Sequence, residues 1–240
     1  MHDALPHVPI RMLGNRLLVL RDQSPKTMGL LEVPEAFREK LFSGVVLAAG
    51  PGGEKYCKTC RKGQGSFHVP VKRGDRVLWK RYAENSQSKP PHSFDLQDAD
   101  SKDLELVFLD SETDLVAKDF GDRFELLRDL VAVRRIEPEK QRGGIIIPDS
   151  VQKAENEGTI IAVGPGGHGD DGQLLPMQFK IGQYVYWPEY AEQVEPAFKR
   201  YEKKGEQIVL LMEHMIEHAV DAAPKAFEGQ RQRHVAKASA

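Results

Sequence analysis

One pattern of residues occurs twice in this chain of 240 residues, in the same order and at a nearly constant spacing. The segment 140–149, KQRGGIIIPD, follows the related segment 26–35, KTMGLLEVPE, by 114 residues. Gly164 keeps the same distance from Gly50, after which the spacing falls, which indicates longer loops in the first copy. A repeat of this length predicts two homologous domains and not a solenoid of short units.

Each copy consists of short apolar runs separated by turn residues, and helical periodicity is nearly absent. Runs of this kind are typical of short β-strands, so we expect an all-β protein made of two small barrels or sandwiches. Trp79 and Trp187 end equivalent strands and are expected in the cores. The expected strand regions are 16–21, 44–52, 73–79 and 104–109 in the first copy, and 130–134, 158–166, 180–187 and 206–211 in the second.

The repeat also sets the expected domain boundaries. A polar connecting segment lies between the copies, and the end of the chain is rich in Ala, Gln, Lys and Arg, which is typical of disorder. The expected parts are a disordered lead-in at 1–8, a first domain at 9–118, a linker at 119–127, a second domain at 128–220 and a disordered tail at 221–240.

The composition narrows the classes of function. The net charge is −2 and the pI is near 6.5, so nothing indicates a nucleic-acid surface. No apolar run reaches the roughly 18 residues of a membrane helix, and no signal peptide is evident. No Ser/His/Asp set or pair of carboxylates stands out as a catalytic constellation. We therefore expect a cytoplasmic protein that is not an enzyme, with no membrane or nucleic-acid partner.

The stretch Ile145, Ile146, Ile147 allows two interpretations. It lies between the glycine pair Gly143-Gly144 and a Pro-Asp turn signal. Glycine visits positive φ freely, and proline supplies no amide donor for a central strand. The stretch is therefore either a short core strand or an apolar binding loop with flexible neighbours.

Two further motifs need an explanation. Residues 164–169 fit the dinucleotide pattern G-x-G-x-x-G, but the acidic residues and proline that follow oppose the helix that such a site requires, so we interpret them as a turn. Cys57 and Cys60 form half of a zinc site, with His68 as a third candidate ligand. We expect an exposed loop with two free thiols, and a zinc or disulfide clip is the minority hypothesis.

Five blocks of the second copy, in order, resemble the GroES-type (chaperonin-10) co-chaperonin family. The first copy matches more loosely in the same order, so the resemblance covers residues 9–220, and the tandem arrangement is similar to the double co-chaperonins of chloroplasts. The five blocks are DLVAVRR at 129–135, GGIIIPD at 143–149, EGTIIAVGPG at 157–166, KIG at 180–182 and EYA at 189–191.

The resemblance implies two tandem GroES-like β-barrel domains and a ring-like dome that caps a chaperonin-60 ring. ATP would be bound by the partner ring, so no cofactor is expected in this chain. The family contacts its partner through the apolar tripeptide of a mobile loop. By motif, this tripeptide is Ile145–Ile147, preceded by Gly143 and Gly144, in the second copy and Leu31-Glu32-Val33 in the first.

The first loop departs from the family pattern, because Glu32 replaces the middle apolar residue and Leu30 replaces the second glycine. In an extended segment Leu31 and Val33 share one face, and Glu32 points to the other. A ring-forming structural or adaptor protein with reduced chaperonin binding is therefore the alternative function. An enzyme of the alcohol dehydrogenase type would need a nucleotide-binding βαβ domain, for which the sequence shows no pattern.

The assembly is left open by the resemblance. Caps of this family usually offer an odd number of seats, which chains of two domains do not fill evenly. The chain would leave a domain unseated, mix with single-domain co-chaperonins, or meet a partner of other symmetry.

Overall fold

The computed structural model describes most of both repeats. The described residues are 5, 10–25, 27–28, 31–32, 34, 39–56, 63–67, 69–83, 105–136, 141–142, 145–146, 156–169 and 173–221. Contacts within the chain define two compact units, which are Met1–Leu127 with His168–Leu175, and Arg128–Gly167 with Pro176–Ala240.

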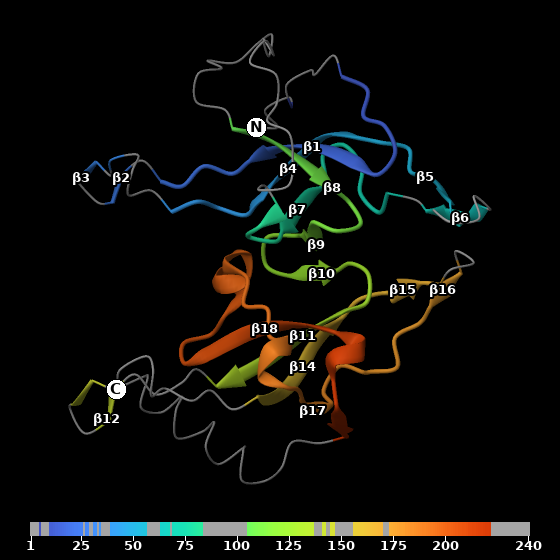
Figure 1. Ribbon diagram of the computed structural model, residues 1–240. Helices are drawn as coiled ribbons and strands as arrows, with labels where there is room; N and C mark the ends of the chain where they lie inside the picture. Colours follow the sequence, from blue (N-terminus) through green and yellow to red (C-terminus); the bar gives the residue numbers. More distant parts are fainter. Residues whose placement is uncertain are drawn as a thin grey trace. The chain divides into compact units, whose positions relative to one another are not determined.

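The first unit is organised around a six-stranded antiparallel sheet with the strand order β10-β9-β7-β4-β1-β8 (Figure 1). Its strands are short and rich in β-branched and apolar residues. Both faces of β1 are buried, since Leu17 and Val19 lie in one apolar cluster and Leu18 lies in another. They are β1 (Arg16–Arg21), β4 (Ser43–Ala49), β7 (Arg76–Trp79), β8 (Leu106–Asp110), β9 (Leu115–Asp119) and β10 (Phe124–Leu126).

The second unit contains a five-stranded antiparallel sheet in the order β18-β11-β14-β17-β19. Its strands are β11 (Leu130–Ile136), β14 (Glu157–Val163), β17 (Tyr184–Tyr186), β18 (Glu206–Met212) and β19 (His218–Val220). Three short 3₁₀ turns join them, η4 (Glu189–Ala191), η5 (Pro196–Tyr201) and η6 (Glu213–Met215).

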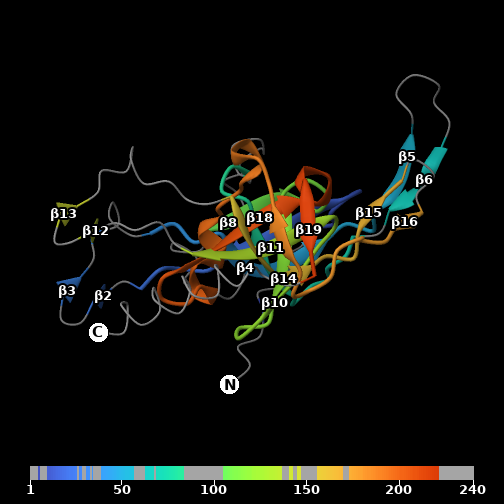
Figure 2. The same cartoon turned by 90° about the horizontal axis from the view of Figure 1, so that it is seen from below.

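Four two-stranded hairpins stand apart from these sheets in the described part of the chain (Figures 1 and 2). Each pairs within itself, so none extends the strand order of a main sheet. They are β2 (Thr27–Met28) with β3 (Leu31–Glu32), β5 (Gly53–Tyr56) with β6 (Gly63–Phe67), β12 (Gln141–Arg142) with β13 (Ile145–Ile146), and β15 (Gly167–His168) with β16 (Leu174–Leu175).

The two sheets share one plan. The order β8-β1-β4-β7-β9 in the first sheet corresponds to β18-β11-β14-β17-β19 in the second. Leu17 pairs with Ala49 and Val131 pairs with Val163, so both members move by 114 positions, and both ladders shift register at the same step. The predictions of an all-β fold and of a repeated domain are therefore confirmed.

The apolar cores confirm the expected positions of the two tryptophans. Trp79 is fully buried and Trp187 is 3% exposed, each within a cluster of branched aliphatic residues of its own sheet. Ala83 and Ala191 follow them at equivalent positions and are also buried in these clusters. The core of each unit is thus built from the same repeat positions.

The segment expected to be a linker, 119–127, differs from the expectation. It contains the end of β9, a tight turn and all of β10, which pairs antiparallel with β9. Phe120 donates a backbone hydrogen bond to Arg123 across the turn at 2.9 Å, and Leu126 and Leu127 are buried. The apolar residues between the charged ones therefore form an edge strand.

The backbone conformation at Arg128 reveals a strained position. Its φ is +63°, and it is the one non-glycine residue with positive φ among the residues described. Gly14, 114 residues earlier, has φ +59° at the equivalent position of the first repeat. A residue with a Cβ atom is disfavoured in this left-handed conformation, whereas glycine is not.

We predict that Arg128→Gly is more stable than Arg128→Ala by about 1 kcal/mol. Both variants lose the same side chain beyond Cβ, so the difference isolates the backbone conformation. Urea denaturation of the two variants, followed by circular dichroism, measures it. Equal midpoints would show that the left-handed conformation costs nothing here.

Candidate partner-binding hairpins

The apolar stretch of the second repeat begins in the hairpin β12–β13. Gln141 pairs with Ile146 and Arg142 pairs with Ile145, so two chain positions separate the paired strands. Those positions are Gly143 and Gly144, the composition that a two-residue β-hairpin connection favours. Gly143, Gly144 and Ile147 themselves lie outside the described residues, and Ile145 and Ile146 are described by their backbone.

The first repeat places an equivalent hairpin at the same offset. Thr27 pairs with Glu32 and Met28 pairs with Leu31 in β2–β3, each 114 positions before its counterpart in β12–β13. Leu31 is thus the positional equivalent of Ile145 in strand pairing as well as in sequence, while Val33 lies outside the described residues. The structural repeat therefore extends to both candidate loops.

The strand pairing bears on the two interpretations of Ile145 and Ile146. In the described part of the chain, β13 pairs with β12 and with no strand of the five-stranded sheet. Figure 1 draws β12, β2 and β3 as strands separate from the two main sheets. A hairpin of two residues per strand is at best marginally stable in water by itself. The arrangement therefore favours a presented segment over a strand of the core sheet.

In each repeat, a buried arginine lies at the end of the strand that precedes the candidate hairpin. The sequence analysis did not identify these two arginines. In the second unit Arg135 is 5% exposed, and its guanidinium bonds to Glu192 and, at 2.9 and 2.8 Å, to Gln207 Oε1. Trp187 Nε1 donates to the same Glu192 carboxylate at 3.3 Å. This network fixes the end of β11, from which the chain continues to β12. The shared offset of 114 residues between Arg21 and Arg135 was the available sequence signal.

In the first unit, the equivalent arginine, Arg21, has different partners. The Arg21 guanidinium lies 5.3 Å from the Trp79 ring centre, contacts Glu105 at 3.1 Å and donates to the carbonyl of Leu41. Both arginines contact a carboxylate, but Arg21 lies against an aromatic face where Arg135 bonds to the amide of Gln207. The anchor is conserved in position between the repeats while its partners differ.

A second network of hydrogen bonds and ion pairs joins the chain before the hairpin β2–β3 to the chain after it. Ser43 Oγ donates to Asp22 Oδ2 at 2.7 Å, and the Asp22 amide donates to the Ser43 carbonyl at 2.8 Å. Arg76 bridges Asp22 at 2.5 Å and Asp119 at 3.1 Å. Burial of Arg76 lowers its pKa, but Asp22 and Asp119 together outweigh this effect, so that the pKa lies above its usual value. Residues that precede and follow the hairpin β2–β3 are therefore held together by charge-assisted hydrogen bonds.

The candidate thiol site lies outside the described residues, since Cys57, Cys60 and His68 are all among those left out. The described hairpin β5–β6 flanks these residues in the sequence. Tyr56, which precedes Cys57, pairs with Gly63 at one end, and Gly53 pairs with Phe67, which precedes His68, at the other. These ends are about 10 Å apart at the usual rise per residue.

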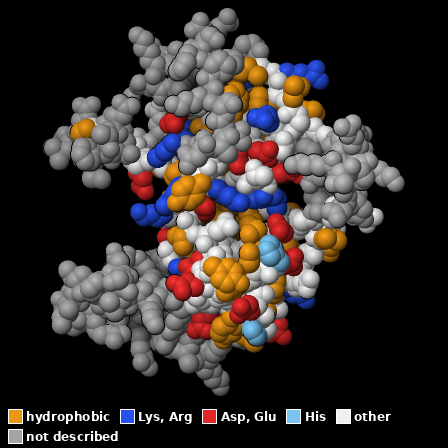
Figure 3. All heavy atoms as spheres, viewed as in Figure 1, with side chains coloured by type: hydrophobic (Ala, Val, Ile, Leu, Met, Phe, Trp, Pro, Cys, Tyr) orange, Lys and Arg blue, Asp and Glu red, His pale blue; other side chains and the backbone are white. Residues whose placement is uncertain are grey.

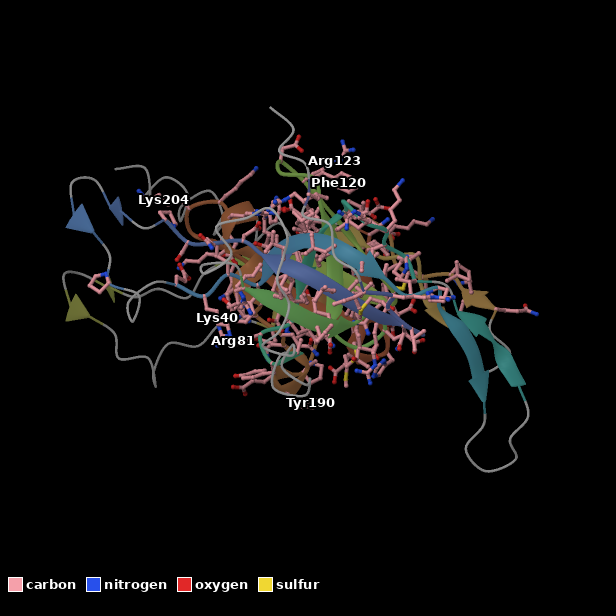
Figure 4. All side chains as sticks on the ribbon, turned by 90° about the horizontal axis from the view of Figure 1, so that it is seen from above. Lys40, Arg81, Phe120, Arg123, Tyr190 and Lys204 are labelled. Carbon is pink, nitrogen blue, oxygen red and sulfur yellow. The ribbon has the colours of Figure 1, made fainter. Side chains whose placement is uncertain are left out.

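Several exposed groups complete the described surface. Tyr82 and Tyr190, at equivalent positions, are 70% and 80% exposed, and Figure 4 shows Tyr190 pointing outward. Acidic and basic side chains are interspersed on the face seen in Figure 3. Among the residues described, no helix is long and apolar enough to cross a membrane, and no cluster of His, Cys, Asp or Glu suited to a metal ion occurs.

Comparison with known families gives two matches along the chain. The sequence model of the family described as "Chaperonin 10 Kd subunit" matches residues 9–108 and again residues 123–219. The two matches begin 114 residues apart, which is the offset of the repeat. They include both hairpins β2–β3 and β12–β13.

Individual relatives agree with this result. The chain is 47% identical over 70 residues to the co-chaperonin GroES of Parvibaculum lavamentivorans, covering 29% of this chain and 67% of the relative. It is 44% identical over 70 residues to co-chaperonin GroES 3 of Bradyrhizobium diazoefficiens, with the same shares. The 20 kDa chaperonin, chloroplastic, of Arabidopsis thaliana is 28% identical over 187 residues, 77% of this chain and 67% of the relative, a match too long for one repeat.

Proposed function

Because this chain belongs to the chaperonin 10 family in both of its halves, we propose that it is a co-chaperonin that caps a chaperonin-60 ring through its two apolar hairpins. The cap closes a chamber in which a client protein folds. The observation that carries the proposal is the pair of equivalent hairpins, β2–β3 and β12–β13. Each is separate from the main sheet of its unit, and each follows a strand that contains a buried arginine.

Weak individual contacts that act together allow a cap both to bind its partner and to dissociate from it. A small hairpin that orders fully on binding gives up conformational entropy at that moment, so a single contact is weak. Several hairpins on one assembly recover affinity, because each bound one raises the effective concentration of the next. A change of state in the partner then weakens all contacts together and releases the cap.

The second hairpin is the stronger candidate for this contact. Its apolar residues, Ile145 to Ile147, are uninterrupted, and Gly143 and Gly144 precede them. In the first hairpin, Glu32 lies between Leu31 and Val33. A carboxylate that docks against an apolar groove without a partner costs several kcal/mol. The first hairpin binds if Glu32 faces solvent while its two neighbours face the groove.

In this proposal, the partner ring carries out the chemical steps that accompany binding and release of the cap. The matched family is not an enzyme family. In this proposal, ATP binds and is hydrolysed on the chaperonin-60 ring. This chain then needs no cofactor of its own. Cytoplasmic location remains a prediction, as do self-association into a dome and mixing with single-domain co-chaperonins.

A ring-forming adaptor with reduced chaperonin binding is the second candidate. Glu32, in the pairing position equivalent to Ile146, is the specific observation in its favour. The intact apolar stretch of the second hairpin opposes it. The two candidates differ in whether the chain is retained by a chaperonin-60 ring.

A capture experiment tests the proposal directly. Immobilised chaperonin-60 rings are incubated with the full chain in the presence of ATP, of ADP or of no nucleotide, and retained complexes are imaged by electron microscopy. We expect retention that depends on nucleotide, with density over one mouth of the ring. Failure to bind under all three conditions would overturn the co-chaperonin proposal and leave the adaptor.

A further inference from the structure

In the second repeat, the arginine before the hairpin and an asparagine after it contact the same carboxylate. Arg135 precedes β12 and Asn156 follows β13, and the two lie 21 positions apart in the sequence. The Arg135 guanidinium donates to Glu192 Oε1. Asn156 donates to the same oxygen at 2.8 Å, with the oxygen and nitrogen of its amide assigned from their hydrogen-bond partners. One mostly buried carboxylate therefore joins the two ends of the segment that contains β12 and β13.

The position of Glu192 is fixed by the short turn η4 of the second unit. Glu192 directly follows this turn, and Ala191 at its end is buried in the apolar cluster of the unit. The side-chain oxygen of Asn156 accepts from the Glu189 amide at 3.2 Å, so the first residue of the turn contacts it as well. The Trp187 amide donates to the Asn156 carbonyl at 3.1 Å. Asn156 is thus held through its backbone and through both atoms of its side-chain amide.

The first repeat joins the equivalent two ends by a different interaction. Phe42 takes the position of Asn156, 114 residues earlier, and its carbonyl accepts from the Trp79 amide at 3.1 Å. The Arg21 guanidinium lies 5.8 Å from the Phe42 ring centre and 5.3 Å from that of Trp79. An aromatic ring after the hairpin therefore meets the arginine directly in the first repeat, as a cation–π contact. In the second repeat, Glu192 links the two ends.

The chemistry of the two side chains explains why a carboxylate lies between them. An asparagine has no aromatic face for a guanidinium, and its amide hydrogens repel the cation. A carboxylate accepts hydrogen bonds from both groups, and bonds of this kind to a charged group are stronger than neutral ones. Arg135 also donates to Gln207 Oε1 on β18 at 2.9 and 2.8 Å. Loss of the Glu192 carboxylate would therefore release Asn156 while Arg135 keeps a partner on the sheet.

We propose that Glu192 is a positioning residue for the partner contact of the second hairpin, because it holds together the two ends of the segment that presents Ile145 and Ile146. A segment with fixed ends samples fewer conformations than one with free ends, so less entropy is lost when its apolar residues dock. The gain is repeated at each hairpin of an assembly. The inference rests on the proposed function and adds to it a residue outside the hairpin that sets the strength of the contact.

Hydrogen exchange of the chain alone tests whether Glu192 joins the two ends. In Glu192→Ala, the Trp187 amide keeps its acceptor, the Asn156 carbonyl, but that residue is no longer held by the carboxylate. We expect exchange at the Trp187 amide, followed by nuclear magnetic resonance, to accelerate at least about tenfold, as in a local opening. The amides of β18 are expected to keep their protection, which distinguishes a local opening from unfolding of the whole unit.

Glu206→Gln is the matched control for this experiment. It removes another buried carboxylate of the second unit, which lies 3.0 Å from Nε of Arg134, the neighbour of Arg135 in β11. We expect exchange at the Trp187 amide to stay as it is in the unmodified chain. Equal exchange at that amide in Glu206→Gln and Glu192→Ala would show that Glu192 does not hold the end of the segment, and it would overturn the inference.

Capture by immobilised chaperonin-60 rings tests the positioning role. We expect Glu192→Ala to be captured about tenfold more weakly than the unmodified chain, because each hairpin loses more entropy on docking. Glu192→Gln keeps an acceptor oxygen for Arg135 and Asn156, so its capture is expected to lie between those two. Glu206→Gln is expected to be captured like the unmodified chain. Urea denaturation gives the folded fraction of each variant, to which its capture is normalised.

The outcomes distinguish this inference from the proposed function. If the unmodified chain is not captured, the proposed function fails and the inference fails with it. If the unmodified chain is captured and Glu192→Ala is captured equally well, the inference alone fails. Capture of Glu192→Gln as weak as that of Glu192→Ala would also overturn it, as would an equal loss in Glu206→Gln, since the effect would then come from the removal of a buried charge.

Discussion

Replacing Ile145 and Ile147 by aspartate is expected to abolish capture of this chain by a chaperonin-60 ring while leaving the five-stranded sheet folded. Each apolar side chain that docks contributes about 1.5–3 kcal/mol, and a carboxylate placed in the same groove adds a desolvation cost. Because several hairpins act together, the loss is multiplied over the ring. We expect capture to fall by at least about 100-fold, measured by retention on immobilised rings.

The same double replacement in the first hairpin, Leu31→Asp with Val33→Asp, is the matched comparison. Glu32 already interrupts that apolar stretch, so we expect a smaller loss of capture. Equal losses in the two hairpins would show that both dock. The circular dichroism spectrum and the melting temperature serve as the folding control. A chain that unfolds on the replacement of Ile145 and Ile147 would place this stretch in the core and contradict the presented-hairpin interpretation.

Replacing Gly164 by alanine is expected to destabilise the second unit by about 3 kcal/mol, at the upper end of overpacking changes. A Cβ atom there would lie 2.1 Å from the Arg128 carbonyl oxygen, and that neighbour is backbone, not a flexible side chain. The Gly164 amide also donates to the Leu130 carbonyl at 2.8 Å, so the strand moves away only by losing that bond. Gly50 has the same close approach, 2.2 Å to the Gly14 carbonyl, in the first unit.

Gly167→Ala is the control for this effect. Its Cβ atom would meet Asp129 Cβ at 3.6 Å, an ordinary van der Waals contact, and its φ is not in the left-handed region. We expect a change within about 0.5 kcal/mol. Urea unfolding followed by tryptophan fluorescence, which includes the buried Trp187, compares the two variants. Similar midpoints for Gly164→Ala and Gly167→Ala would show that the backbone adjusts at low cost.

Much of the fold could be predicted from periodicity and spacing. The runs that begin at Arg16 and Leu130 form β1 and β11, since short apolar runs bounded by turn residues are typical of strands. Trp79 and Trp187 lie in the cores as expected. The candidate hairpins were located by their offset, although the strand pairing that separates them from the main sheets was not foreseen.

The remaining features depend on partners far away in the sequence. Arg135 at the root of the second hairpin is held by Gln207 and Glu192, 72 and 57 residues further along. No local pattern marks such a network, because a charged residue at a strand end is usually solvent-exposed. The strain at Arg128 was likewise invisible, since arginine gives no local signal for positive φ.

The sequence by itself determined that this chain is a tandem repeat of all-β chaperonin 10 domains, since spacing and residue identity recur directly along it. Only the tertiary structure decided where the segment 119–127 belongs. The second family match begins at residue 123, but β10 pairs with β9 of the first unit, so that residues up to Leu127 belong to the first compact unit. Strand pairing is made by backbone groups that every residue carries, so which edges meet is settled by geometry and not by residue identity.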